Sequence, residues 1–247
     1  MEALKAKDML RLWERGQGQR PLERALTLLS VAWPEKTYDE LACLSVGRRD
    51  ACLLAVRERT FGTTLDCFID CAQCAEPLEF TASTNDIRAP SPSGEGEPGQ
   101  EGTLEAGEYR IRYRLPDSHD LRTIAGMSDV AAARRSLLDR CIVQADGRDG
   151  LVDVAQLPET VTSTLSRRLA ECDPQADTLL DICCPSCGHQ WQALFEINEF
   201  FWTELADYAR HLLREVHMLA RAYCWREADI LAMTTRRRQQ YLEVLRT

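Results

Sequence analysis

Two pairs of cysteines with the same C-x-x-C spacing constrain the fold of this chain more than any other feature. Cys71 and Cys74 form the first pair, and Cys184 and Cys187 form the second. A C-x-x-C turn lets two sulfurs reach one ion, and zinc takes four tetrahedral ligands, among which thiolates are strong. Strand-like residues precede and follow each turn, so two such turns facing each other would make a zinc ribbon. The sequence therefore predicts one zinc ion bound by all four cysteines.

The distance between the two pairs requires this ribbon to be split. About 15–20 residues usually divide the pairs of a four-cysteine zinc site, whereas 109 residues separate Cys74 from Cys184. The segment 85–177 is therefore expected to be an insertion. Gly188 follows the second turn, where a left-handed backbone is often needed, and the first turn lacks a glycine at the matching place. Two unrelated turns with reduced thiols, or a redox pair, remain the alternatives.

Three neighbouring side chains offer substitutes for one of these ligands. Cys67 and Cys183 lie on the strands that enter the turns, where we interpret them as packing residues, and His189 follows the second turn. The set is complete without them. Four sulfurs leave no open position for water, which a catalytic zinc needs. The chain also has no Walker loop and no G-x-S-x-G elbow. We therefore expect no enzymatic activity and no small-molecule substrate.

The overall charge and hydropathy limit the classes of partner. The chain has 247 residues with 30 Lys and Arg against 39 Asp and Glu, which gives a net charge of −9. Proteins that coat nucleic acid carry the opposite sign, because phosphate contacts dominate their affinity. No stretch approaches the roughly 20 apolar residues that span a bilayer, and the N-terminus has no secretory signal. We expect a cytoplasmic protein without nucleic-acid or membrane partners.

The pattern along the chain indicates a mostly α-helical α+β protein, with helical N- and C-terminal parts around a small split zinc-ribbon element. The expected parts are an N-terminal helical part (1–65), a first zinc knuckle with strands (66–84), a disordered loop (85–108), an inserted strand and helices (109–177), a second zinc knuckle with strands (178–197) and a C-terminal amphipathic helical tail (198–247).

Several local expectations follow from residue type and spacing. Pro21, the Thr37–Glu40 box and Ser45 indicate helix starts, and Gly62 indicates a helix end. Residues 89–107 are rich in proline, glycine and glutamate and are expected to form no packed structure. The strand candidate at 109–115 is expected to pair with 79–81. Helices are expected at 128–142 and 158–172, and one long amphipathic helix begins near 198.

Two other groups of residues are candidates for function. Asp117 and Asp120 flank His119, and a helix start explains this cluster better than an acid–base centre does. Partner-binding candidates are the aromatic residues Trp202, Tyr223 and Trp225 and the basic run Arg236, Arg237 and Arg238. Aromatic side chains on an amphipathic helix are more often part of a core, and a basic run is more often a solvated helix face.

The C-terminal part carries a longer pattern, which runs through 213–223, 225–231, Arg236–Arg237–Arg238 and Tyr241–Leu242. It resembles the C-terminal signature of T4-type phage baseplate hub assembly chaperones, which occur with contractile phage tails and contractile injection systems. Shorter matches to the longer, cysteine-bearing members of this family occur at 23–26, 47–50, 60–62 and 173–177. The resemblance thus covers most of the chain.

The resemblance implies a non-enzymatic assembly factor, a chaperone or scaffold, for the baseplate hub of a phage-tail-like particle. Its partners would be baseplate hub or spike proteins or the tape-measure protein, bound through protein–protein contacts before tail assembly. Two other functions remain open on the residues alone. One is a zinc-ribbon nucleic-acid-binding adaptor, and the other is a thiol-based redox sensor.

Overall fold

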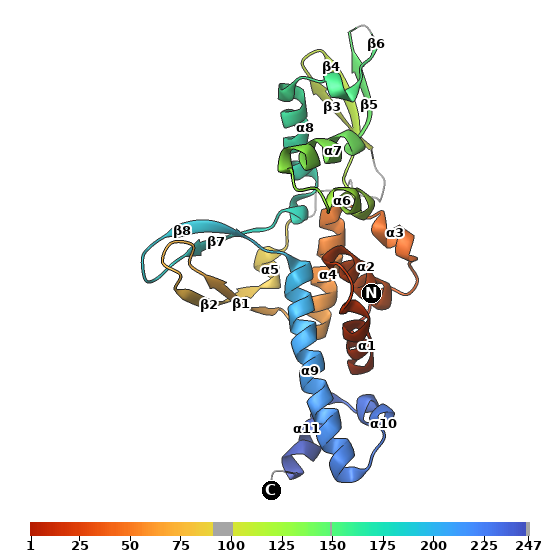
Figure 1. The fold of residues 1–247 in the computed structure, drawn as a ribbon, viewed down its shortest axis with the longest axis vertical. Coiled ribbons are helices and arrows are strands. Elements are labelled where there is room, and N and C mark those ends of the chain that lie inside the picture. The colour runs from red at the N-terminus through yellow and green to blue at the C-terminus, as the bar shows by residue number, and fades with distance from the viewer. Residues whose placement is uncertain (91–100, 149, 246–247) are drawn as a thin grey trace.

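The computed structural model describes residues 1–90, 101–148 and 150–245, which form an α+β fold arranged along one long helix (Figure 1). That helix is α9 (Ile197–Tyr223), whose 27 residues span about 40 Å. A helical body packs beside its first half, and an arm of β-ribbons projects to one side (Figure 1). An inserted module lies beyond the body, and a small helical knob surrounds the last turns of α9. No helix of the described ranges is long and apolar enough to cross a membrane.

The helical body confirms the helices expected before residue 65. It contains α1 (Ala6–Gly16), α2 (Pro21–Ala32), α3 (Tyr38–Ala42) and α4 (Val46–Phe61). Thr37 accepts a hydrogen bond from the backbone N–H of Glu40 at 3.2 Å, and Ser45 accepts one from Arg48 at 3.3 Å. Both side chains are therefore the helix caps that the sequence predicted. Leucines of these helices form the core together with Phe201 of α9.

The arm consists of two antiparallel hairpins. They are β1 (Thr64–Asp70) with β2 (Pro77–Ser83), followed by α5 (Thr84–Ile87), and β7 (Leu179–Cys183) with β8 (Gln190–Leu194). The expected strands on both sides of each C-x-x-C turn are confirmed. The expected pairing of 79–81 with 109–115 is wrong, because Thr81 lies opposite Asp66. Closing a short local turn costs less entropy than pairing across a long connection.

The inserted module is a four-stranded antiparallel sheet covered by helices. The strands, in the spatial order β3-β4-β5-β6, are β3 (Glu101–Ala106), β4 (Tyr109–Arg114), β5 (Ile142–Gly147) and β6 (Gly150–Leu151). The helices are α6 (Ser118–Ile124), α7 (Val130–Cys141) and α8 (Glu159–Cys172), with 3-10 turns at Val154–Gln156 and Pro174–Ala176. Ile111, Leu138 and Leu165 lie in a core that is separate from that of the body.

One expectation for this module is wrong. The segment 85–108 is not one disordered loop, because α5 begins at Thr84 and β3 occupies residues 101–106; residues 91–100 lie outside the described residues. Ala106 pairs with Tyr109, so Gly107 and Glu108 form a two-residue turn in which Gly107 has a φ of +64°. The helix expected at 128–142 is confirmed as α7, which begins at Val130 and ends at Cys141, and Ile142 begins strand β5.

The knob closes the C-terminal end of the chain. Helix α9 ends at Tyr223, and Cys224 turns the backbone with a φ of +55°. Two short helices follow it, α10 (Glu227–Ala232) and α11 (Thr235–Val244). Their buried side chains, Ile230 and Leu242, pack on the buried face of α9 and on Leu10 of α1.

Candidate metal centre

The two C-x-x-C turns of the arm have the same backbone hydrogen bonds. The Cys71 N–H donates to the Glu76 carbonyl, and the Cys184 N–H donates to the His189 carbonyl, both at 2.9 Å. Four residues after each first cysteine the backbone is left-handed, with a φ of +57° at Ala75 and +73° at Gly188. The first turn therefore adopts the conformation of the second although it lacks the glycine, and alanine carries the conformational cost.

The structure brings the four predicted cysteines together at the tip of the arm. One sulfur of each turn faces one of the other, with 3.7 Å between the Sγ atoms of Cys71 and Cys187 and 3.7 Å between those of Cys74 and Cys184. All four Sγ atoms lie within 4.8 Å of one another. A tetrahedral ion with metal–sulfur bonds of about 2.3 Å has sulfurs about 3.8 Å apart, whereas disulfide sulfurs are about 2.05 Å apart. The four cysteines can therefore bind a metal ion.

The four sulfurs have different exposures. Cys71 and Cys184 are 3% and 1% exposed and pack with Leu78 and Ile182 in a core of four buried residues. Cys74 and Cys187 are exposed. The arm thus has a very small apolar core, and half of its candidate ligand set faces solvent. A core of this size stabilises little on its own.

Neighbouring groups shift the pKa values of Cys71 and Cys74 in opposite directions. Backbone N–H groups of Cys74 and Gln73 favour the thiolate of Cys71 and lower its pKa to about 6, although burial opposes them. At Cys74 the backbone N–H of Glu76 also favours the thiolate. The sulfurs of Cys187 and Cys71 outweigh it and raise the Cys74 pKa to about 12. Several thiolates so close together would repel one another, and a bound cation would stabilise them.

The three possible substitutes do not join this group. Within the described part of the chain, the cluster of potential metal ligands at this site contains the four cysteines and does not include Cys67, Cys183 or His189. Cys67 is buried in the core of the body, as expected of a packing residue. Cys183 is exposed, so its interpretation as a packing residue is wrong; it lies on the outer face of a two-stranded ribbon. The His189 ring stacks on Trp191 with 5.3 Å between the ring centres.

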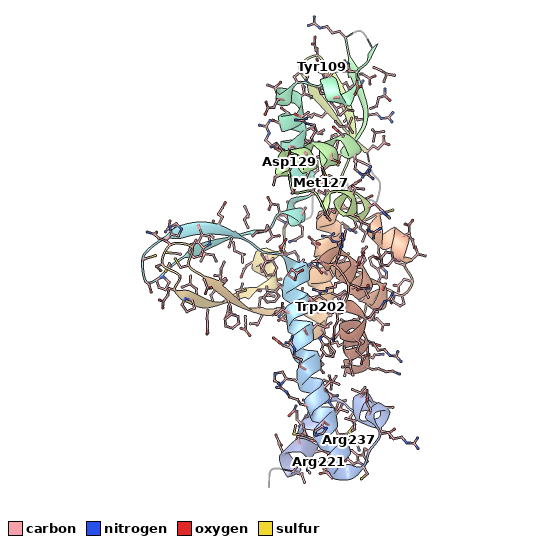
Figure 2. All side chains as sticks on the ribbon, viewed as in Figure 1. Tyr109, Met127, Asp129, Trp202, Arg221 and Arg237 are labelled. Atoms are coloured by element: carbon pink, nitrogen blue, oxygen red, sulfur yellow. The ribbon has the colours of Figure 1, made fainter. Side chains whose placement is uncertain are left out.

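Trp202, one of the partner-binding candidates, contacts the helical body. Figure 2 shows it on α9 beside the helices of the body. A Cβ added at Gly16 would lie 2.2 Å from the Trp202 ring, so the indole packs directly on this glycine. The Arg24 guanidinium lies 4.6 Å above the same ring and donates to the Gly16 carbonyl at 3.0 Å. Trp202 is half-buried, and its packing against α1 and α2 stabilises the contact between α9 and the body.

The remaining partner candidates gather in the knob, and one of them is buried there. Tyr223 and Trp225 stack with 4.5 Å between ring centres, and Tyr241 packs edge-on against both. Arg236 and Arg237 are exposed. Arg238 is only 1% exposed, since its guanidinium is held inside the knob by Glu215 at 2.9 Å. The basic run therefore has two exposed arginines, and the third is a buried structural residue.

The structure contains a groove and a second group of potential metal ligands that were not predicted from the sequence. A groove of about 380 Å³ lies between α9 and α11, lined by His217, Met218, Arg221, Ala222, Leu242 and Leu245. Figure 2 places Arg221 and Arg237 at this same end of the molecule. The second feature is a group of three potential metal ligands, Asp39, Cys43 and His119. The four-residue spacing of Asp39 and Cys43 was its one signal in the sequence.

Comparison with known proteins identifies the family. Residues 27–202 match the family described as T4 bacteriophage base plate protein. The matched range includes most of the body, both hairpins of the arm and the whole inserted module. The C-terminal pattern at 213–242 lies outside it. No curated protein and no solved structure gives a significant match. Because the match covers well over half of the chain, this protein belongs to the T4 bacteriophage base plate protein family.

Proposed function

We propose that Cys71, Cys74, Cys184 and Cys187 bind one structural Zn²⁺ ion. The sulfur spacing, the tetrahedral preference of zinc and the lowered pKa of Cys71 support this assignment. Four thiolates would complete the coordination shell, so the ion would stabilise the arm rather than activate water. Zinc binding energy would then act as folding energy for the two hairpins.

We further propose that the chain is a non-enzymatic assembly factor, acting in the cytoplasm as a chaperone or scaffold for a baseplate hub. Its partners would be other baseplate proteins, from the hub or spike, or the tape-measure protein. The observation that carries this proposal is the meeting of two separate two-stranded sheets at four sulfurs. A metal there would hold the two hairpins of the arm together as one rigid element that projects from the body, which suits a protein that binds other components of an assembly.

We propose that the knob carries the surface that binds another baseplate protein. Arg221 and His217 border the groove between α9 and α11, and Met218 and Leu245 give it an apolar lining. Arg236 and Arg237 do not line the groove but are exposed on α11, at the same end of the molecule. Basic groups around an apolar groove favour an apolar segment flanked by acidic residues. We propose that another baseplate protein supplies such a segment.

Co-expression of the tagged chain with the other baseplate proteins of its particle tests this function. The expected result is capture of a hub, spike or tape-measure protein, and a weaker capture by the double variant Arg236→Glu with Arg237→Glu. The exposed pair Arg134 and Arg135 of α7 offers a matched control with the same charge change. Equal loss in both double variants would contradict the proposed surface. A wild-type chain that captures none of these proteins would contradict the function.

The alternative functions predict different results with the same protein. A nucleic-acid adaptor would bind DNA or RNA with a steep dependence on salt concentration, which filter binding measures. A redox sensor would lose free thiols under mild oxidant while it carries no zinc. Neither behaviour is expected of a zinc-stabilised assembly factor.

A further inference from the structure

A second group of metal-ligating side chains lies where the body meets the inserted module. Asp39 belongs to α3, Cys43 directly follows that helix, and His119 is in the first turn of α6. One ligand atom of each residue lies within 4.8 Å of those of the other two. The group combines a carboxylate, a thiol and an imidazole, which are the three side-chain types that bind zinc in proteins.

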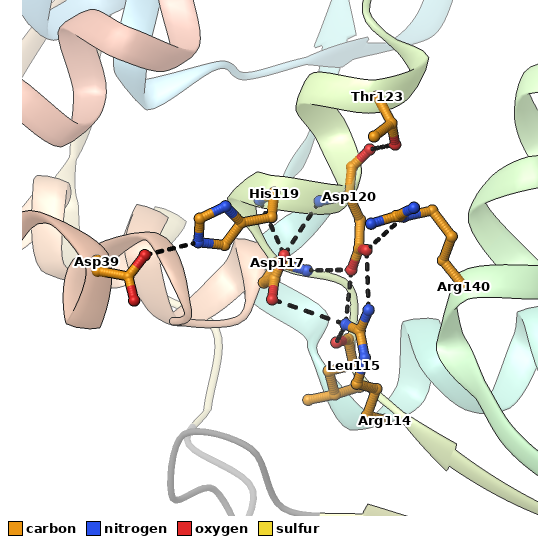
Figure 3. Close-up of polar contacts among 8 residues, drawn as sticks. All are labelled: Asp39, Arg114, Leu115, Asp117, His119, Asp120, Thr123 and Arg140. Atoms are coloured by element: carbon orange, nitrogen blue, oxygen red, sulfur yellow. Dashed lines mark hydrogen bonds and ion pairs between the residues drawn. The ribbon is translucent and has the colours of Figure 1, made fainter.

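Local structure brings these three side chains together. Residues 39 and 43 are one helical turn apart, and the backbone of Cys43 continues the helical conformation at the end of α3, so the two side chains share a face. The Thr37 and Glu40 capping box fixes the start of this short helix. The backbone N–H of His119 donates to the Asp117 side chain at 2.9 Å, which sets the start of α6. Figure 3 shows the resulting approach of the His119 ring to the Asp39 carboxylate across the junction.

The separation of His119 and Asp39 fits shared coordination better than a direct hydrogen bond. The His119 Nε2 and Asp39 Oδ1 atoms are 3.4 Å apart, whereas N–H···O bonds are commonest near 2.9–3.0 Å. Nitrogen and oxygen ligands on a tetrahedral zinc ion, each bonded at about 2.05 Å, are about 3.3 Å apart. The Cys43 Sγ atom also lies within 4.8 Å of the ligand atoms of both residues.

The charges around this group favour a cation. The Asp39 side chain is 83% exposed, and its carboxylate has the imidazole as its partner. Asp117 adds a second carboxylate nearby. The Arg114 guanidinium is held by Asp120 at 2.6 Å and also lies 3.7 Å from Asp117. Arg140 donates to Asp120 as well, so the nearby arginines are engaged on the side away from Asp39 (Figure 3).

We propose that Asp39, Cys43 and His119 form a second, open site for a zinc-class divalent transition metal. Three protein ligands leave a fourth position for water or for a donor atom from a partner. The Cys43 thiol would release its proton to solvent as the metal–sulfur bond forms. The bound ion would join α3 to α6, beside the backbone hydrogen bond from Val46 N to Pro116 O at 3.0 Å. The body and the inserted module would thereby be coupled through metal.

Cobalt(II) titration of the zinc-loaded full-length chain tests this site by absorption spectroscopy. At about pH 8, where metal competes better with the thiol proton, one equivalent of Co²⁺ is expected to produce a sulfur-to-cobalt charge-transfer band. Cys43→Ser should abolish this band, and His119→Gln should weaken cobalt binding at least tenfold. Cys224→Ser is the matched control, since Cys224 is also exposed but lies in the knob.

The outcomes of this titration are distinct from those of the four-cysteine site. A band that persists in Cys43→Ser would arise from cobalt exchange into the arm and would overturn the proposal. The absence of any band in the wild-type chain would overturn it as well. Equal effects of Cys224→Ser and Cys43→Ser would show that the response is not specific to this junction. Of the three substituted side chains, Cys43 and Cys224 are exposed and His119 is half-buried, so the substitutions should not disrupt the core. Circular dichroism checks that each variant is folded.

Discussion

The carboxylate of Asp173 holds the first turn of α4, since its Oδ2 accepts a hydrogen bond from the backbone N–H of Gly47 at 2.8 Å. The Ser45 hydroxyl donates to the other oxygen at 3.1 Å. Gly47 and Asp173 are 126 positions apart in sequence, and their hydrogen bond connects the helical body to the segment between the inserted module and the arm. The two short sequence patterns at 47–50 and 173–177 are therefore one structural unit.

Gly47→Ala is predicted to destabilise this junction. A Cβ at position 47 would lie 2.3 Å from Asp173 Oδ1 and 2.7 Å from the backbone nitrogen of Ala176. Relief of this overlap requires a shift of backbone, so we expect a loss of about 1–3 kcal/mol in the free energy of unfolding. Urea denaturation measures this loss. Gly18→Ala is the control, because a Cβ there meets nothing within 4 Å; equal stability of the two variants would contradict the packing.

The contribution of Asp173 to stability is predicted to fall as pH rises. Burial raises the pKa of its carboxyl, and the hydrogen bonds from Gly47 and Ser45 only partly offset this shift. A raised pKa in the folded state gives stability that is fully present below the ordinary Asp pKa of about 3.9. This stability is lost as pH rises through the folded-state pKa.

Asp173→Asn isolates that titration, because an amide oxygen can still accept the Gly47 hydrogen bond. The free energy of unfolding of the wild type, minus that of the variant, is predicted to be largest in acid and to decrease toward neutral pH. Urea denaturation at a series of pH values measures the difference. A difference that increases with pH would show that the folded-state pKa is lowered instead.

Arg238 and Arg236 are predicted to behave oppositely although both are arginines of α11. Arg238 is buried, and it donates to Glu215 at 2.9 Å and to the Met233 carbonyl at 2.8 Å. Its replacement by alanine leaves the half-buried carboxylate of Glu215 without its charged partner, although Gln239 still donates to it, and should cost about 3 kcal/mol. Arg236→Ala should change stability by less than about 0.5 kcal/mol. Thermal unfolding compares the two, and similar melting temperatures would be inconsistent with the buried position of Arg238.

The sequence was most informative where the signal is local. The C-x-x-C turns, the caps at Thr37 and Ser45 and the regular apolar spacing of α9 each depend on neighbouring residues, and the structure contains all of them. The β3–β4 hairpin was missed because its strand follows a segment rich in proline and glutamate. Here Leu104 opposite Ile111 determines the pairing more than composition does.

Features that depend on residues distant in sequence could not be predicted from the sequence. Arg238 is buried because Glu215 lies on a neighbouring helix, and no pattern in α11 distinguishes it from Arg236. Likewise, Asp39 and His119 meet only when the inserted module packs against the body. The general nature of the arm was predictable from its cysteines, but the orientation of the arm relative to α9 depends on tertiary packing.

The most direct test of the central claim is the zinc content of three chains purified in parallel: the wild type, Cys184→Ser and Cys183→Ser. The two substituted cysteines are adjacent, but only Cys184 is buried in the four-sulfur group. We predict that Cys184→Ser loses one zinc ion per chain and that amide hydrogens of β1, β2, β7 and β8 then exchange rapidly, because structural zinc supplies folding energy. Cys183→Ser should keep both its zinc and its protection. Equal zinc content in Cys184→Ser and the wild type, with an arm that stays protected, would contradict the shared zinc site.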